Sequence, residues 1–196
     1  MNIIKSTGTF SFYTLISRVL GYLRDILIAI FLGSGALADA FFVAFRIPNT
    51  FRRLFGEGSF NAAFIPSYSK ELIKGKTNAR NFANNIFNLL TIFLLILIAI
   101  VELFMPLFVS IIAPGFKSNP EKFLLAVQLT KITFPFILFV SLASFFSAIL
   151  NSYNKFAAAS AAPIILNIFL ILILLFGKIL DEKLVIYLSY GVSLAG

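Results

Sequence analysis

Five arginines lie in or at the ends of two stretches near the start of the chain that are otherwise apolar enough to enter a membrane. The stretches are residues 3–31 and 36–55, and the arginines are Arg18, Arg24, Arg46, Arg52 and Arg53. A charged side chain at the centre of a bilayer costs from about 2.5 to more than 10 kcal/mol, so such residues normally face a protein interior or a water-filled cavity. Because a guanidinium group donates parallel hydrogen bonds to phosphate oxygens, the cluster predicts a binding site for an anionic ligand that carries phosphate.

Helical geometry places the polar residues of each stretch on one face. At about 100° per residue, the polar face of the first stretch covers an arc of about 120°. Its residues are Thr14, Ser17, Arg18, Gly21, Arg24 and Asp25. The polar face of the second stretch covers about 80° if the helix continues past its proline. Its residues are Asp39, Arg46, Asn49, Arg53 and Glu57. We therefore expect the two polar faces to turn toward each other around a hydrated cavity.

A structural role is the alternative for each of these charges. Arg18 with Asp25, or Asp39 with an arginine of the first stretch, would form buried ion pairs that fix helix packing. The arginines of the second stretch would instead reach an interface or act only as topology signals. The excess of positive charge favours ligand binding, because the five arginines are opposed by only two acidic residues through position 53.

The composition predicts the elements that must position these residues. Of the 196 residues, 60% are hydrophobic and 12% are charged, with a mean hydropathy of +0.99, whereas globular domains carry about 25% charged residues. Since a membrane helix needs about 20 mostly apolar residues, we expect an all-α polytopic membrane helix bundle. It has five complete spans and the start of a sixth, truncated one, with a basic loop over 56–81. The spans are expected at 3–31, 36–55, 82–105, 127–150, 156–176 and 184–196.

The basic residues between the spans predict an orientation. The segment 52–80 holds six basic residues against two acidic ones and is the most basic loop of the chain. Loops rich in Lys and Arg face the cytoplasm. We therefore expect the N-terminus and this loop to lie on the cytoplasmic side.

The residue types that are missing exclude several kinds of chemistry. With no Cys and no His, the chain has no disulfide, thiol redox site, usual zinc site or His-dependent triad. The acidic residues are too dispersed for a metal-dependent glycosyltransferase, and without a P-loop no ATP site is expected. We expect a protein that is not an enzyme and has neither a cofactor nor a nucleic-acid partner. A membrane potential or an ion gradient stays open as the driving force.

Several runs of sequence resemble the N-terminal signature of the MurJ (MviN) lipid II flippases, which belong to the MOP exporter superfamily. The longest are SRVLGYLRD at 17–25, ADAFFVAFRIPN at 38–49 and RRLFGEGSF at 52–60. Shorter matches follow in the same order, at 63–66, 113–116, 131–135 and 148–152. Members of this family are longer, two-lobed membrane proteins. The resemblance covers essentially the whole chain and implies that residues 1–196 are the N-terminal lobe of such an exporter.

The resemblance also implies a substrate and a set of site residues. The family moves lipid II, the undecaprenyl-pyrophosphate-linked disaccharide-pentapeptide precursor of peptidoglycan, across the bacterial cytoplasmic (inner) membrane by alternating access. The residues that match the functional set are Arg18, Arg24, Asp39 and Arg52. Those that match positions near the cavity or its lateral opening are Ser17, Asn49 and Glu57, and the cationic cavity would also include Arg46 and Arg53. The partners implied are lipid II, the bilayer and a C-terminal lobe of the same protein.

Two other interpretations stay open at this point. A polyprenyl-pyrophosphate polysaccharide flippase, or another exporter of the MOP superfamily, would handle a ligand of similar charge. A structural membrane subunit would use its cationic faces to bind anionic lipid head groups. A cation extruder is disfavoured, because its cavity should be dominated by carboxylates and here arginines dominate.

Overall fold

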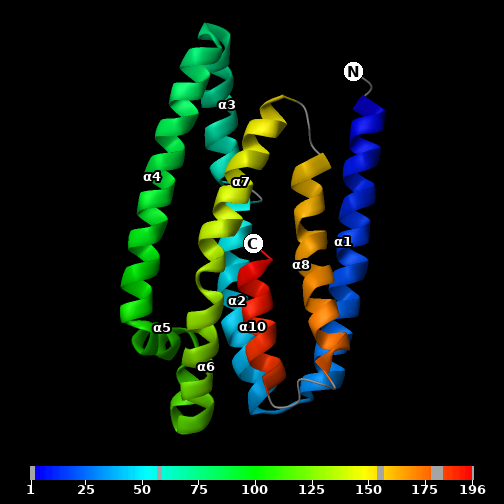
Figure 1. Cartoon of the computed structure of the whole chain (residues 1–196), viewed down its shortest axis with the longest axis vertical. Coiled ribbons are helices and arrows are strands. Elements are labelled where there is room, and N and C mark those ends of the chain that lie inside the picture. The colour runs from blue at the N-terminus through cyan, green and yellow to red at the C-terminus, as the bar shows by residue number, and fades with distance from the viewer. Residues whose placement is uncertain (1–2, 57–58, 154–156, 178–182, 196) are drawn as a thin grey trace.

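The computed structural model describes residues 3–56, 59–153, 157–177 and 183–195, and within that part every element is a helix (Figure 1). This confirms the prediction of an all-α chain. The elements are α1 (Ile3–Leu32), α2 (Ala36–Gly56), α3 (Ser59–Lys74), α4 (Lys76–Leu103), α5 (Met105–Ile112), the 3₁₀ helix η1 (Pro114–Ser118), α6 (Pro120–Thr133), α7 (Phe136–Ser152), α8 (Ala157–Leu175) and α10 (Leu184–Leu194).

The long helices run roughly parallel or antiparallel to one another in an elongated bundle (Figure 1). Gly33, with a φ of 65° that favours glycine, lies in the short turn between α1 and α2. Beyond this turn the two helices diverge. Helix α1 packs along α8, whereas α2 packs against α6, α7 and α10. The main apolar core is centred on the last group of helices, where it includes the fully buried Phe41, Leu129, Ile137 and Leu188, and it extends to α8 through Leu170 and Leu174.

Helix α4 exposes apolar side chains around most of its circumference. Its buried residues are Ala79, Ala83 and Leu94. Its exposed large apolar residues include Leu89, Ile92, Phe93, Leu95, Ile96 and Ile100. Two segments of the described chain are long and apolar enough to cross a membrane, namely α4 and Pro120–Ser152. An apolar surface of this kind suits contact with hydrocarbon, and the number of spans stays a prediction.

The segment 56–81 is predicted as a basic loop, but its described residues, 56 and 59–81, are largely helical. Helix α3 continues the line of α2, and Gly75, with a φ of 137°, then turns the chain into α4 (Figure 1). Phe64 is 4% exposed and packs its ring 5.2 Å from that of Phe145 and 5.9 Å from that of Phe82, between ring centroids. The burial of these aromatic rings against α4 and α7 explains why a basic segment is ordered as a helix.

The span predicted at 127–150 consists of two helices that begin earlier and end later. Helices α6 and α7 together cover 120–152 and are separated at Phe134 and Pro135. A proline cannot donate the backbone hydrogen bond that would continue a helix. Just before the break, the buried Thr133 hydroxyl donates to the carbonyl oxygen of Ala44 at 2.9 Å and ties α6 to α2. The span predicted at 82–105 likewise begins earlier, at Lys76.

Candidate functional site

The guanidinium group of Arg24 makes several hydrogen bonds with neighbouring side chains. Its Nε and Nη2 donate to Oδ1 of Asp25 at 2.9 and 2.7 Å, and its Nη1 donates to Oδ1 of Asn167 at 2.8 Å. The guanidinium carbon lies 5.0 Å from the ring centroid of Phe45 on α2. The Arg24 side chain is 12% exposed, while that of Asp25 is 56% exposed. Residues of α1, α2 and α8 therefore surround the Arg24 guanidinium. Its positive charge is compensated by the exposed carboxylate of Asp25.

Asn167 is a site residue that the sequence interpretation missed. It lies on α8, is 5% exposed and also donates from Nδ2 to the backbone carbonyl oxygen of Ser17 at 3.0 Å. The amide therefore contacts α1 at two points, Ser17 and Arg24. A signal was present in the sequence, because α8 is almost wholly apolar and Asn167 is its single carboxamide residue. Polar side chains inside apolar helices commonly bond to neighbouring helices.

Asp39 pairs with a lysine from a distant part of the chain. Its Oδ2 accepts a hydrogen bond from Nζ of Lys122 in the first turn of α6, and this Nζ also lies 4.3 Å from the ring centroid of Phe116. The structural alternative that paired Asp39 with an arginine of the first helix is wrong. The alternative pairing of Arg18 with Asp25 is not what the structure records either, since Asp25 binds Arg24.

The remaining predicted residues are spread over α1 and α2. Arg18 and Arg46 are exposed, and Ser17 and Asn49 are half-buried. Arg52 and Arg53 belong to α2, but their side chains lie outside the described part of the structure, and Glu57 lies outside the described residues altogether.

The polar faces of α1 and α2 lie less close to each other than the sequence predicts. Because α1 packs along α8 and α2 packs against α6 and α7, the two helices share few contacts. The contact of the Arg24 guanidinium with Phe45 joins the first face to an apolar residue of α2. Among the predicted site residues with described side chains, the structure thus brings together Ser17 and Arg24 through Asn167, and holds Asp39 apart with Lys122.

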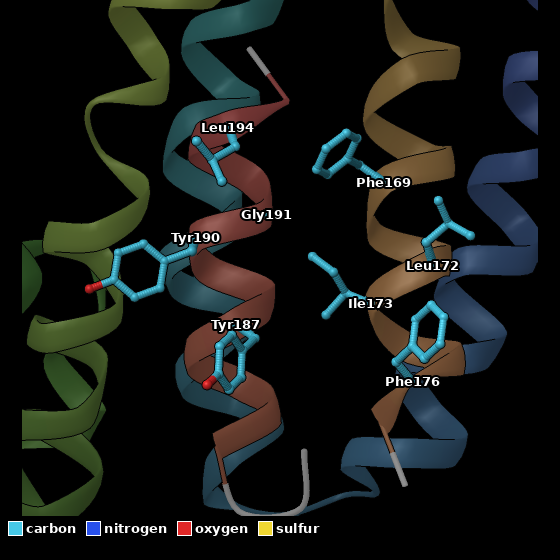
Figure 2. A pocket seen from close by; sticks show the side chains of 8 residues that line it. All are labelled: Phe169, Leu172, Ile173, Phe176, Tyr187, Tyr190, Gly191 and Leu194. Atoms are coloured by element: carbon cyan, nitrogen blue, oxygen red, sulfur yellow. The ribbon is translucent and has the colours of Figure 1, made fainter. Parts of the chain in front are cut away.

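Hollows formed by described residues also lie elsewhere in the bundle. One, of about 290 Å³, separates α8 from α10 and is lined by apolar side chains and two tyrosines (Figure 2). Another, of about 580 Å³, lies between α3 and the start of α4 and includes Lys70, Glu71 and Lys74. Within the described residues, no group of three or more His, Cys, Asp or Glu side chains is placed to hold a metal ion.

Comparison with known proteins identifies the family. A family model described as "Lipid II flippase MurJ" matches residues 28–196. The chain belongs to the MurJ family. Relatives in this family include the "Probable lipid II flippase MurJ" of Rickettsia prowazekii (strain Madrid E), which is 40% identical over 96% of this chain and 38% of its own length. The protein of the same name from Rhizobium tropici is 42% identical over 100% of this chain and 38% of its own length.

A solved structure supports the same assignment to the MurJ family. The chain titled "Lipid II flippase MurJ, inward closed conformation" matches with a TM-score of 0.78 and 31% sequence identity, over 95% of this chain and 39% of that one. The "Lipid II flippase MurJ" of Burkholderia cenocepacia is 37% identical over 86% of this chain and 33% of its own length. The chain described here therefore spans about two fifths of the length of the MurJ proteins that it matches.

Proposed function

We propose that this chain is the N-terminal lobe of a lipid II flippase, a transporter that moves the peptidoglycan precursor from the inner to the outer leaflet of the bacterial cytoplasmic membrane. The match of the MurJ family model over residues 28–196 carries this proposal. The relatives that bear the name lipid II flippase match 86–100% of this chain, and this favours lipid II over the polysaccharide precursors. The proposed activity is transport, with no catalytic step.

The chemistry of the substrate explains why a protein is needed. A pyrophosphate linked to sugars cannot enter hydrocarbon unaided, because its charges and hydroxyl groups would lose their hydrogen bonds to water. A cavity that opens alternately to either side of the membrane lets this head group pass while the polyprenyl tail stays in lipid, and the rocking of two lobes is a known way to achieve this. The C-terminal lobe and lipid II are therefore the proposed partners.

Arg24 is the residue that we propose binds the pyrophosphate, together with Arg18 and Arg52. Its guanidinium is held in place before any ligand arrives, and Phe45 covers one of its faces. Such an arrangement suits charge-assisted hydrogen bonds to phosphate oxygens. A phosphate that approaches Arg24 competes with the carboxylate of Asp25, which is bonded to Nε and Nη2. We propose that the N-terminus and the turn between α3 and α4 face the cytoplasm.

Lipid II translocation by the full-length protein in proteoliposomes tests the proposal. Arg24→Ala should abolish translocation, and Arg24→Lys should lower it strongly, because lysine keeps the charge but loses the bidentate fork. Arg80→Ala is the matched control, since Arg80 is an exposed arginine near the start of α4, and it should transport normally. Equal amounts of folded protein must be reconstituted for each variant. Normal translocation by Arg24→Ala would refute the proposed role of Arg24, and failure of the native protein to translocate lipid II would refute the function.

A further inference from the structure

Asn167 is a buried amide in an apolar helix, and it directs both ends of its side chain at α1. It is 5% exposed, between Leu166, which is also 5% exposed, and the exposed Ile168. An amide that leaves water without new hydrogen bonds costs several kcal/mol in an apolar medium, so a buried amide needs partners. Both of its described partners belong to α1: the carbonyl of Ser17 and the guanidinium of Arg24.

The two hydrogen bonds of Asn167 have different consequences. The bond from Nδ2 to the Ser17 carbonyl is 3.0 Å long and ties the amide to the α1 backbone, which fixes the orientation of the amide plane. Because Nδ2 is bonded to the Ser17 carbonyl, Oδ1 faces Arg24 and accepts a hydrogen bond from Nη1 at 2.8 Å. The first bond therefore determines where the acceptor for Arg24 lies.

The bonds of Arg24 leave a defined part of its guanidinium group available. A guanidinium carries five N–H groups. Three of the five are used by the bonds to Asn167 and Asp25, and the guanidinium carbon lies over the ring of Phe45. Asp25 follows Arg24 directly in α1, so it moves with the same backbone, whereas Asn167 comes from α8 and provides a reference point on another helix.

We propose that Asn167 is a positioning residue that sets the direction of the Arg24 guanidinium and so prepares it to bind an anionic phosphate group. The inference rests on the proposed function for the identity of the ligand, but not for the orientation of Arg24. Without Asn167, the described hydrogen bonds of the guanidinium are those to its neighbour Asp25, whose side chain is 56% exposed and lies on the same helix. Arg24 then becomes accessible to reagents in solution and presents no fixed pair of donors.

The test measures the accessibility of Arg24 directly, without substrate. The full-length protein in detergent is treated with phenylglyoxal, which modifies arginine, and labelling of the Arg24 peptide is followed by mass spectrometry. In Asn167→Leu, which has similar volume but no polar group, we expect the labelling rate of Arg24 to rise about tenfold. This factor equals about 1.4 kcal/mol, near the low end for a hydrogen bond to a charged group. Asn167→Asp loses the bond to the Ser17 carbonyl but retains an acceptor for Nη1, and its negative charge strengthens the bond to Arg24, so it should keep the labelling rate low.

Two controls distinguish a loss of Arg24 positioning from a general loss of helix packing. Leu174→Ala creates a defect in the same helix, at a fully buried residue of the apolar core, and should leave Arg24 labelling near the native rate. Arg18, which is exposed, should be labelled equally in all variants. The proposal is refuted if Arg24 labelling in Asn167→Leu stays at the native rate, if Leu174→Ala raises it as much, or if Asn167→Asp raises it as much as leucine does.

Lipid II translocation provides the second readout and links the inference to the proposed function. Asn167→Leu should raise the lipid II concentration needed for half-maximal transport about tenfold, the same factor as the labelling rate. If labelling changes as expected while this concentration does not, Asn167 positions Arg24 but the arginine does not bind lipid II, and the proposed role of Arg24 fails. If labelling does not change, the positioning role fails, whatever transport does.

Discussion

Lys122 and Asp39 form an ion pair that joins the first turn of α6 to the first turn of α2. The carboxylate is 55% exposed and the lysine side chain 20% exposed, so water reaches the pair mainly from the aspartate side. The Lys122 ammonium group also lies over the ring of Phe116, which provides a second partner for its charge. Asp39 is thus held at one end of the bundle, near the turn that joins α1 to α2, by a lysine from the first turn of α6 (Figure 1).

We expect this pair to contribute modestly to stability. Asp39→Asn and Lys122→Ala should show a coupling free energy of about 0.5–1 kcal/mol in a double-mutant cycle, the range of partly exposed ion pairs. Unfolding of the full-length protein in mixed detergent micelles measures this coupling free energy. Added salt should reduce the coupling because the pair is accessible to ions. Lys117→Ala, at an exposed lysine of η1, should show no coupling to Asp39→Asn. Additive effects of Asp39→Asn and Lys122→Ala would contradict the expectation.

The stability of helix α3 should depend on the burial of its aromatic residues. Phe64→Ala removes a ring that contacts Phe82 on α4 and Phe145 on α7 and should lower the free energy of unfolding by about 3 kcal/mol. Ile73→Ala, at a residue of the same helix that is 87% exposed, should change it by less than about 0.5 kcal/mol. Unfolding of the two variants, compared under the same conditions, measures the difference. Equal effects would mean that α3 does not pack as described.

The helices could be predicted from the sequence because their signal is local. The expected stretches 3–31 and 36–55 agree with α1 and α2 to within about one residue, since apolar runs and a glycine-rich turn mark them. The same logic failed for α3. Its aromatic residues recur every four positions, at Phe60, Phe64 and Tyr68, and this spacing predicts a helix with one buried side. The basic residues of the same segment instead indicate a loop.

The candidate site was less predictable, because its partners are distant along the chain. Arg24 could be identified by the cost of a charge in an apolar helix. Its bond to Asn167 joins positions 143 residues apart and follows from the packing of α1 along α8, which no local pattern specifies. Helical phases predict which residues share one side of α1, but the phases of separate helices do not say which helices are neighbours.

Gly191 marks a close approach between α10 and α8. A Cβ atom there would lie 2.3 Å from Cδ1 of Ile173 and 3.3 Å from Cδ2 of Leu170. Ile173 lies beside the hollow between the two helices, and its side chain extends toward α10 (Figure 2). Gly191→Ala should therefore lower the free energy of unfolding by about 1 kcal/mol, the low end for overpacking, because the Cδ1 atom that it meets is the far end of a side chain beside a hollow and because alanine itself favours a helix over glycine.

Ile173→Val is the matched second variant, because it removes only the Cδ1 atom that the new methyl group would meet. Alone it should cost about 0.5 kcal/mol, the low end for the loss of one methyl group, because Ile173 is half-buried beside the hollow. Combined with Gly191→Ala it should recover most of the stability, because the shortened side chain no longer overlaps the new Cβ, and the two changes should be strongly non-additive. Unfolding of the single and double variants measures this coupling. If the two losses simply add, the steric explanation for glycine at 191 is wrong.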